Sequence, residues 1–264
     1  MDYRANVYSP LQNMAIWLGA WIFGHVPTDE CLAALTELGG SHRIYGQNPD
    51  SKGATLDFLK FIRSVVGAEP HVTATDEPLV RLILAGPGEA PRVPAGSLAA
   101  TAIIDGQQGA LEVRGSEHAI VLVPELDSLG CRWRFFEFVD PLPAPAYLSP
   151  GDADLLLADA TRDAAQLIEG LAPSSRAQAL PNPRLTVGSL SDFYDVPGLP
   201  LHTPPRAAKL FARADRVAAI LETVSHHAGD HSFDPQLLPL WRHIRAARMA
   251  GVDYALREFS LKSY

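Results

Sequence analysis

The spacing of apolar residues changes twice along the chain, and this change limits the folds that the chain can adopt. Up to about residue 66 apolar residues recur at helical spacing, and they do so again from residue 149 onward. Between residues 79 and 139 they fall instead into short runs typical of strands. This order predicts an α+β fold in a single domain over 1–264, with a helical part at 1–70, a sheet at 78–140 and a second helical part at 149–264.

Five segments in the middle of the chain have the pattern of strands, namely 79–84, 100–104, 110–113, 119–123 and 132–139. Their short connections favour a mainly antiparallel sheet, covered by the N-terminal and C-terminal helices. Residues 120–123 are apolar in succession, so we expect this strand to lie inside the sheet. In the strand before it, apolar residues alternate with Glu112 and Arg114, which predicts a strand exposed on one face.

The composition is that of a globular protein with a substantial core, since 47% of the 264 residues are hydrophobic. The formal charge of −8 weighs against binding to nucleic acid or to an anionic membrane. The charge is unevenly distributed: residues 204–264 hold nine basic and six acidic residues, and the first 203 residues have an excess of 11 acidic residues. This asymmetry indicates either packing between the two parts or a surface for a separate acidic partner.

Cysteine content and the lack of a targeting pattern bear on the compartment. Cys31 and Cys131 are too few for a disulfide framework, so we predict free buried thiols, with one long-range bridge as the alternative. The longest apolar run near the start, residues 14–23, is too short to span a bilayer, and no basic region precedes it. We therefore expect a cytoplasmic protein. Four lysines stand against 18 arginines, which together with the many alanines and prolines indicates a bacterial genome rich in G and C.

Three histidines and an aspartate lie within residues 226–231, and such side chains suit a divalent transition metal. His226 and His231 are the candidate ligands. Neighbouring helical positions diverge by about 100°, however, so adjacent histidines do not easily share one ion, and the segment lacks the helical metalloprotease pattern. We interpret the histidines as residues of a helix C-terminus, where imidazole interacts well with the helix dipole, and keep metal binding as the alternative.

Four basic residues lie on one face of the helix predicted after residue 204: Arg206, Lys209, Arg213 and Arg216. We call this set the basic stripe. Arginine binds carboxylates and phosphates through paired hydrogen bonds, so the stripe is the candidate binding surface for a partner or ligand. A solvated face is the simpler interpretation. The stripe can either pack within the chain or bind an external partner, and we favour packing against the acidic middle of the same chain. The last helix carries a second, partial stripe of Arg242, Arg245 and Arg248.

No motif for nucleophilic catalysis, phosphate binding or cofactor binding occurs in the sequence, and we expect no cofactor. We predict a non-enzymatic cytoplasmic protein that acts through protein–protein contact, with an acidic partner or with a second copy as a homodimer. The alternative is an enzyme or small-ligand-binding protein whose site lies between the sheet and the loop at 86–96. Nucleic-acid binding is the least favoured class, because base-stacking aromatic residues do not accompany the basic stripe.

Overall fold

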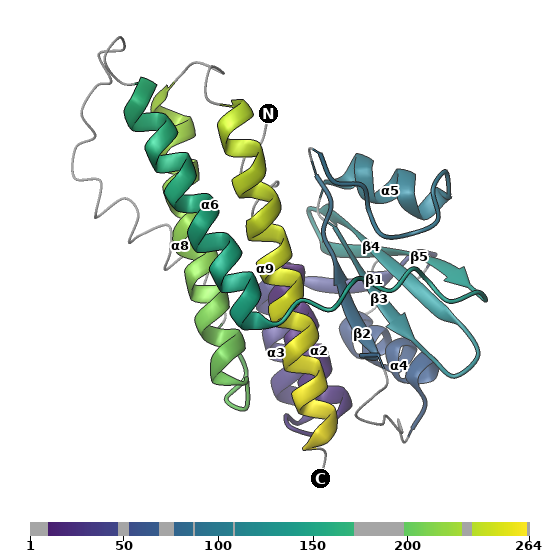
Figure 1. The fold of residues 1–264 in the computed structure, drawn as a ribbon. Coiled ribbons are helices and arrows are strands. Elements are labelled where there is room, and N and C mark those ends of the chain that lie inside the picture. The colour runs from purple at the N-terminus through teal and green to yellow at the C-terminus, as the bar shows by residue number, and fades with distance from the viewer. Residues whose placement is uncertain are drawn as a thin grey trace.

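A computed structural model describes residues 10–46, 53–68, 77–86, 88–107, 109–171, 198–228 and 234–262. Within these ranges the chain forms seven helices and a five-stranded, mostly antiparallel sheet (Figure 1). The predicted α+β class, with helices on both sides of the sheet region in sequence, is confirmed. None of the helices in the described ranges is both long and apolar enough to cross a membrane.

The helices are α2 (Leu11–Ile22), α3 (Thr28–Gly39), α4 (Ala54–Val66), α5 (Leu98–Gly106), α6 (Pro150–Leu171), α8 (Pro205–Ala228) and α9 (Asp234–Leu261). The strands are β1 (Ser41–Ile44), β2 (Val80–Ile83), β3 (Ala110–Arg114), β4 (Ala119–Asp127) and β5 (Gly130–Phe138). They lie in the order β1-β5-β4-β3-β2, with β1 parallel to β5 and the other pairs antiparallel.

One predicted strand is wrong and one strand was missed. The segment 100–104 belongs to helix α5, which begins where the Ser97 hydroxyl accepts a hydrogen bond from the Ala100 amide at 3.1 Å. A short apolar run fits a buried helix as well as a buried strand, so its periodicity could not separate the two. The missing strand is β1, inside the part predicted to be helical. The prediction that residues 120–123 lie inside the sheet is confirmed, because β4 pairs with both β3 and β5.

The two faces of the sheet have different covers. Helices α2, α3, α4 and α9 contribute to the large core on one face, where Leu82, Leu111 and Trp133 are buried. Helix α5 covers the other face through Ala99 and Ile103. Helix α9 also belongs to a separate helical cluster with α6 and α8, so it joins the sheet layer to the C-terminal helices (Figure 1).

Two arginines of α9 tie the helix to its neighbours from within the protein. The Arg248 guanidinium has an exposed side-chain fraction of 0%, and its Nη1 donates to Asp215 of α8 and to Gln12 of α2, both at 2.7 Å. Arg245 is also buried. The predicted second basic stripe is therefore wrong for these two residues, because both are buried and paired with residues of other elements, Arg248 with Asp215 and Gln12 and Arg245 with Glu89.

Cys31 and Cys131 are free and buried, as predicted. Burial raises the pKa of each thiol to about 12, which keeps both thiols protonated at neutral pH. The prediction of one domain over 1–264 stays a prediction.

Candidate functional site

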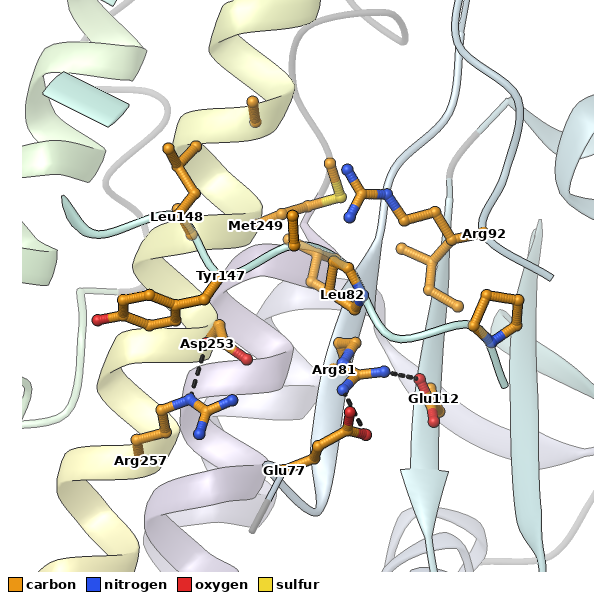
Figure 2. Close-up of a pocket in the computed structure, with 16 residues that line it drawn as sticks. Glu77, Arg81, Leu82, Arg92, Glu112, Tyr147, Leu148, Met249, Asp253 and Arg257 are labelled. Carbon is orange, nitrogen blue, oxygen red and sulfur yellow. Dashed lines mark hydrogen bonds and ion pairs between the residues drawn. The ribbon is translucent and has the colours of Figure 1, made fainter. Parts of the chain in front are cut away.

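A cavity of about 90 Å³ lies where the edge strand β2 meets helix α9 (Figure 2). An edge strand has no further strand beside it, and here α9 and a connecting segment cover it. This segment, residues 141–149, runs from β5 across α9 to α6 (Figure 1), and we call it the strap. The strap is held at both ends, because Leu142 is buried on the α5 face of the sheet and Leu148 packs against the C-terminal helical cluster.

The walls of the cavity are partly apolar and partly charged. Among the apolar residues, Leu82 and Ile83 come from β2, Met249 and Ala250 come from α9, and the strap supplies others. The strap residues that line the cavity are Pro143, Pro145, Ala146, Tyr147 and Leu148. A cavity with apolar walls and a few converging polar groups is the usual form of a small-molecule site.

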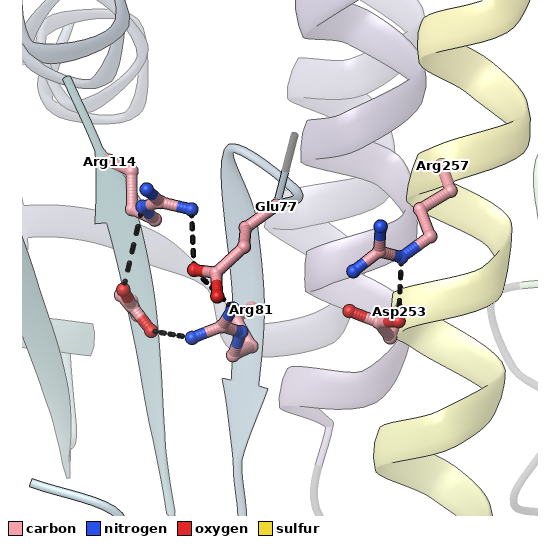
Figure 3. Close-up of polar contacts among 6 residues, drawn as sticks. Glu77, Arg81, Arg114, Asp253 and Arg257 are labelled. Atoms are coloured by element: carbon pink, nitrogen blue, oxygen red, sulfur yellow. Dashed lines mark hydrogen bonds and ion pairs between the residues drawn. The ribbon is translucent and has the colours of Figure 1, made fainter. Parts of the chain in front are cut away.

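Two buried charges face each other at the floor of the cavity. Arg81 of β2 and Glu112 of β3 are direct neighbours in the antiparallel register, and Arg81 Nη1 donates to Glu112 Oε2 at 3.1 Å. Glu77 completes the group by accepting from Arg81 at 2.8 Å and from Arg114 at 2.7 Å (Figure 3). These contacts hold both arginines in fixed positions.

Two polar groups of the floor are affected by their burial, the Glu112 carboxyl and the Nε of Arg81. Burial raises the pKa of the Glu112 carboxyl, although the charges of Arg81 and Arg114 oppose this change. The Nε of Arg81 is buried and has no hydrogen-bond partner among the residues that the structure describes. A buried donor without a partner needs an explanation, and a bound molecule in the adjacent cavity would provide one.

A second ion pair stands on the α9 side of the cavity. Arg257 Nε donates to Asp253 Oδ2 at 2.9 Å, one helical turn apart (Figure 3). The Arg257 guanidinium also lies 5.7 Å from the centre of the Tyr147 ring, at the distance of a cation–π contact. This contact connects the strap to α9 at the rim of the cavity.

The loop at 86–96 supplies one more cation. Arg92 lines the cavity at the end where Met249 lies (Figure 2), and the structure gives it no ion pair with any described residue. The loop is held to α9, because Arg245 Nε donates to Glu89 Oε2 at 3.1 Å and both side chains are largely buried. Arg92 therefore projects from an anchored loop.

The basic stripe lies elsewhere, on helix α8. All four of its side chains are exposed, and they line an open groove beside α6. Arg213 Nε contacts Asp154 Oδ1 of α6 at 3.0 Å, with both side chains about half exposed. The expectation that the stripe is buried against the acidic middle of the chain is wrong, because α8 turns its apolar face to α6 and α9 and leaves the stripe outside.

The metal hypothesis falls outside what the structure describes. His231 and the side chain of His226 are not among the described positions. Within the described residues, no group of three or more histidine, cysteine, aspartate or glutamate side chains could hold a metal ion.

Sequence reasoning missed the charged floor of the cavity. The alternation in β3 predicted an exposed Glu112, but its side chain is only 3% exposed. Arg81 stands in an otherwise apolar strand, and a charged residue in such a run is a signal for a buried pair or a site. The predicted alternative site between the sheet and the loop at 86–96 is close to the observed cavity, because Arg92 belongs to that loop.

Known proteins resemble this chain along most of its length. Residues 12–147 match the model described as "Rv1486c-like protein, N-terminal domain", and residues 151–249 match "Rv1486c-like protein, C-terminal domain". The chain is 24% identical to "Uncharacterized protein ML1804" of Mycobacterium leprae and 25% identical to "Uncharacterized protein MT1533" of Mycobacterium tuberculosis, in each case over 95% of this chain and 98% of the relative. Both relatives are bacterial, in agreement with the composition. No solved structure matches the chain.

Proposed function

The chain belongs to the Rv1486c-like protein family, and we propose that it binds a small organic carboxylate in the cavity between β2, the strap and α9. The observation that carries this proposal is the exposed Arg92 guanidinium, which has no ion pair with a described residue, beside a partly apolar cavity whose other charges are paired. This is the small-ligand alternative of the sequence analysis, with a named ligand class.

The balance of charge supports an anionic ligand. Around the floor, Arg81 and Arg114 are balanced by Glu77 and Glu112. At the rim, Arg257 is balanced by Asp253. Arg114 lies beside the floor without lining the cavity, and with its charge included one positive charge, on Arg92, is left over. A single negative charge on the ligand compensates it, and a carboxylate fits the forked geometry of a guanidinium.

The size of the cavity supports a small ligand. A water molecule needs roughly 10–15 Å³ of such space, so 90 Å³ holds roughly six to nine non-hydrogen atoms. The apolar walls of Leu82, Met249 and the strap prolines favour an aromatic or branched aliphatic body behind the carboxylate. Benzoate has this form and serves as the test ligand.

Calorimetric titration of the purified protein tests the proposal with three matched compounds, benzoate, benzamide and benzylamine. We expect benzoate to bind, and the neutral and cationic analogues to bind at least about tenfold more weakly, because neither compensates Arg92. The variant R92Q should weaken benzoate binding by about tenfold or more. The control variant R162Q removes an exposed arginine of α6 and should leave binding unchanged. Equal binding of benzamide, or an unaffected R92Q variant, would contradict the proposal.

A second candidate function is the protein–protein contact predicted from the sequence, with an acidic partner or a second copy. The observation that favours it is the exposed basic stripe beside an open groove. It uses a different surface from the carboxylate site, so the two functions can be tested separately. The predicted cytoplasmic location belongs with this proposal, since a cytoplasmic partner would meet the protein there.

A further inference from the structure

Helices α6 and α8 lie side by side (Figure 1). An open groove of about 910 Å³ lies between them. Arg206, Lys209, Arg213 and Arg216 of α8 line it, and Asp154 is the acidic residue that lines it from α6. We call this feature the basic groove. Its charge is opposite to that of the chain as a whole, which carries −8.

The positive charges of the basic groove are largely free to meet a partner. Arg213 is paired with Asp154, and Arg206, Lys209 and Arg216 have no ion pair within the described part of the chain. From Arg206 to Arg216 there are ten helical steps, which correspond to about 15 Å along the α8 axis. The spacing of three, four and three residues matches the spacing of side chains on one face of another helix.

The groove also has an apolar component. Ile220 is 40% exposed, Ala212 is exposed and Ala158 is half-buried, whereas Leu210 and Val217 at the base already pack in the helical core. Ala158 and Ala212 are small and line the groove from opposite helices. A ligand that fills this groove therefore needs apolar side chains beside its acidic ones.

We propose that the basic groove binds an acidic amphipathic helix of a partner protein. The charges complement those of the groove, and the apolar face of such a helix would cover Ile220, Ala212 and Ala158. A nucleic acid would satisfy the cations and leave Ile220 exposed. This inference rests on the second proposed function, contact with a protein partner, and specifies the partner's chemistry and its place on α8.

The scarcity of lysine allows a site-specific test. The chain has four lysines, Lys52, Lys60, Lys209 and Lys262, and Lys209 lies in the basic groove. The probe is a biotinylated helical peptide of about 20 residues, with glutamates along one face and leucines along the other, beside a matched peptide carrying glutamine for glutamate. A carbodiimide, which joins a carboxylate to a lysine amine as an amide, links bound peptide to the protein, and mass spectrometry locates the link.

We expect the acidic peptide to bind, to link mainly to Lys209, and to bind at least about tenfold more tightly than the glutamine peptide. The variant R213E/R216E should abolish binding, and the control K60E/R242E, with the same change of charge at exposed positions outside the groove, should bind like the wild type. Circular dichroism shows whether each variant is folded, and the glutamine peptide tests the charge requirement on unaltered protein.

Several results would overturn the inference. Links mainly at Lys60 or Lys262 would show that the peptide binds outside the basic groove. Equal losses of peptide affinity in the groove variant and the control variant would show the same. Tighter binding of a single-stranded oligonucleotide than of the acidic peptide would assign the groove to nucleic acid. Concentration-dependent dimers that R213E/R216E abolishes would make a second copy the occupant. Failure of every peptide to bind would count against the inference and against the contact function together.

Discussion

Arg81 and Glu112 stand directly opposite each other on β2 and β3, and both side chains are more than nine-tenths buried. A buried ion pair at the edge of a sheet is costly unless its remaining polar groups are satisfied. Glu77, which precedes β2, pairs with Arg81, and Arg114 at the end of β3 pairs with Glu112, while Arg81 Nε has no partner among the described residues. The pair thus fixes the floor of the cavity before any ligand enters.

The first prediction concerns this pair. Replacing Glu112 with alanine leaves Arg81 buried with one carboxylate fewer, and the free energy of unfolding should fall by about 3 kcal/mol. The control E137A removes a carboxylate of β5 whose side chain is 59% exposed, and it should change stability by less than about 0.5 kcal/mol. Urea unfolding measures both. Similar values for the two variants would show that the Arg81–Glu112 pair is not needed for the fold.

The second prediction concerns the arginine that joins three helices. D215A removes the acceptor on α8 for the fully buried Arg248, and it should cost about 3–5 kcal/mol. D159A removes the exposed partner of Arg162 on α6, and such surface pairs contribute about 1 kcal/mol or less. Thermal and urea unfolding of both variants compare the two positions. A small effect of D215A would mean that Asp215 is dispensable for holding Arg248 between the helices.

The third prediction concerns acid sensitivity. His42 is buried, its Nε2 donates to the Leu35 carbonyl at 2.7 Å, and its Nδ1 accepts from Trp133 Nε1 at 3.0 Å. Burial lowers its pKa from 6.5 to about 4, although the contact with Leu35 opposes the change.

The unfolded chain therefore takes up a proton on His42 at a higher pH than the folded chain does. Protonation favours unfolding as the pH falls from 6.5 towards 4, and His42 alone should lower stability by about 1.8 kcal/mol between pH 7 and pH 5. In H42Q this part of the pH dependence should disappear, as urea unfolding at the two pH values would show. An unchanged dependence in H42Q would place the acid-sensitive group elsewhere.

The fourth prediction separates two costs of replacing a glycine, the backbone strain at positive φ and the steric clash of an added Cβ. Gly88 and Gly109 both have positive φ, 77° and 83°. An added Cβ at Gly88 meets nothing within 4 Å, whereas at Gly109 it would lie 2.5 Å from the Ile83 carbonyl oxygen of β2. G88A should cost about 1 kcal/mol from the backbone alone. G109A should cost clearly more, because β2 must move, and equal values by urea unfolding would refute the close contact.

The sequence was sufficient for the fold class because the alternation of helical and strand periods is long and regular. It failed at 100–104 and at β1, where the segments are short and tertiary contacts decide the conformation. The parallel pairing of β1 with β5 joins residues far apart in the chain, and no local pattern indicates such a contact.

The candidate site was predictable only in part. The loop at 86–96 was predicted to border an alternative site, but Arg92 within it was not singled out from the sequence. The burial of Glu112, Arg245 and Arg248 was not predictable, because charged residues at regular spacing usually face solvent. Each of these charges is matched by a residue from another element, and this complementarity becomes visible only in three dimensions.

The most direct test of carboxylate binding uses the methionine methyl groups. The sequence contains three methionines, Met1, Met14 and Met249; Met249 lines the cavity and Met14 is buried in the main core at 1% exposure. In protein labelled with ¹³C at these methyl groups, titration with benzoate should move the NMR signal of Met249 in a saturable way and leave that of Met14 in place. A Met249 signal that stays fixed up to millimolar benzoate would contradict a carboxylate site in this cavity.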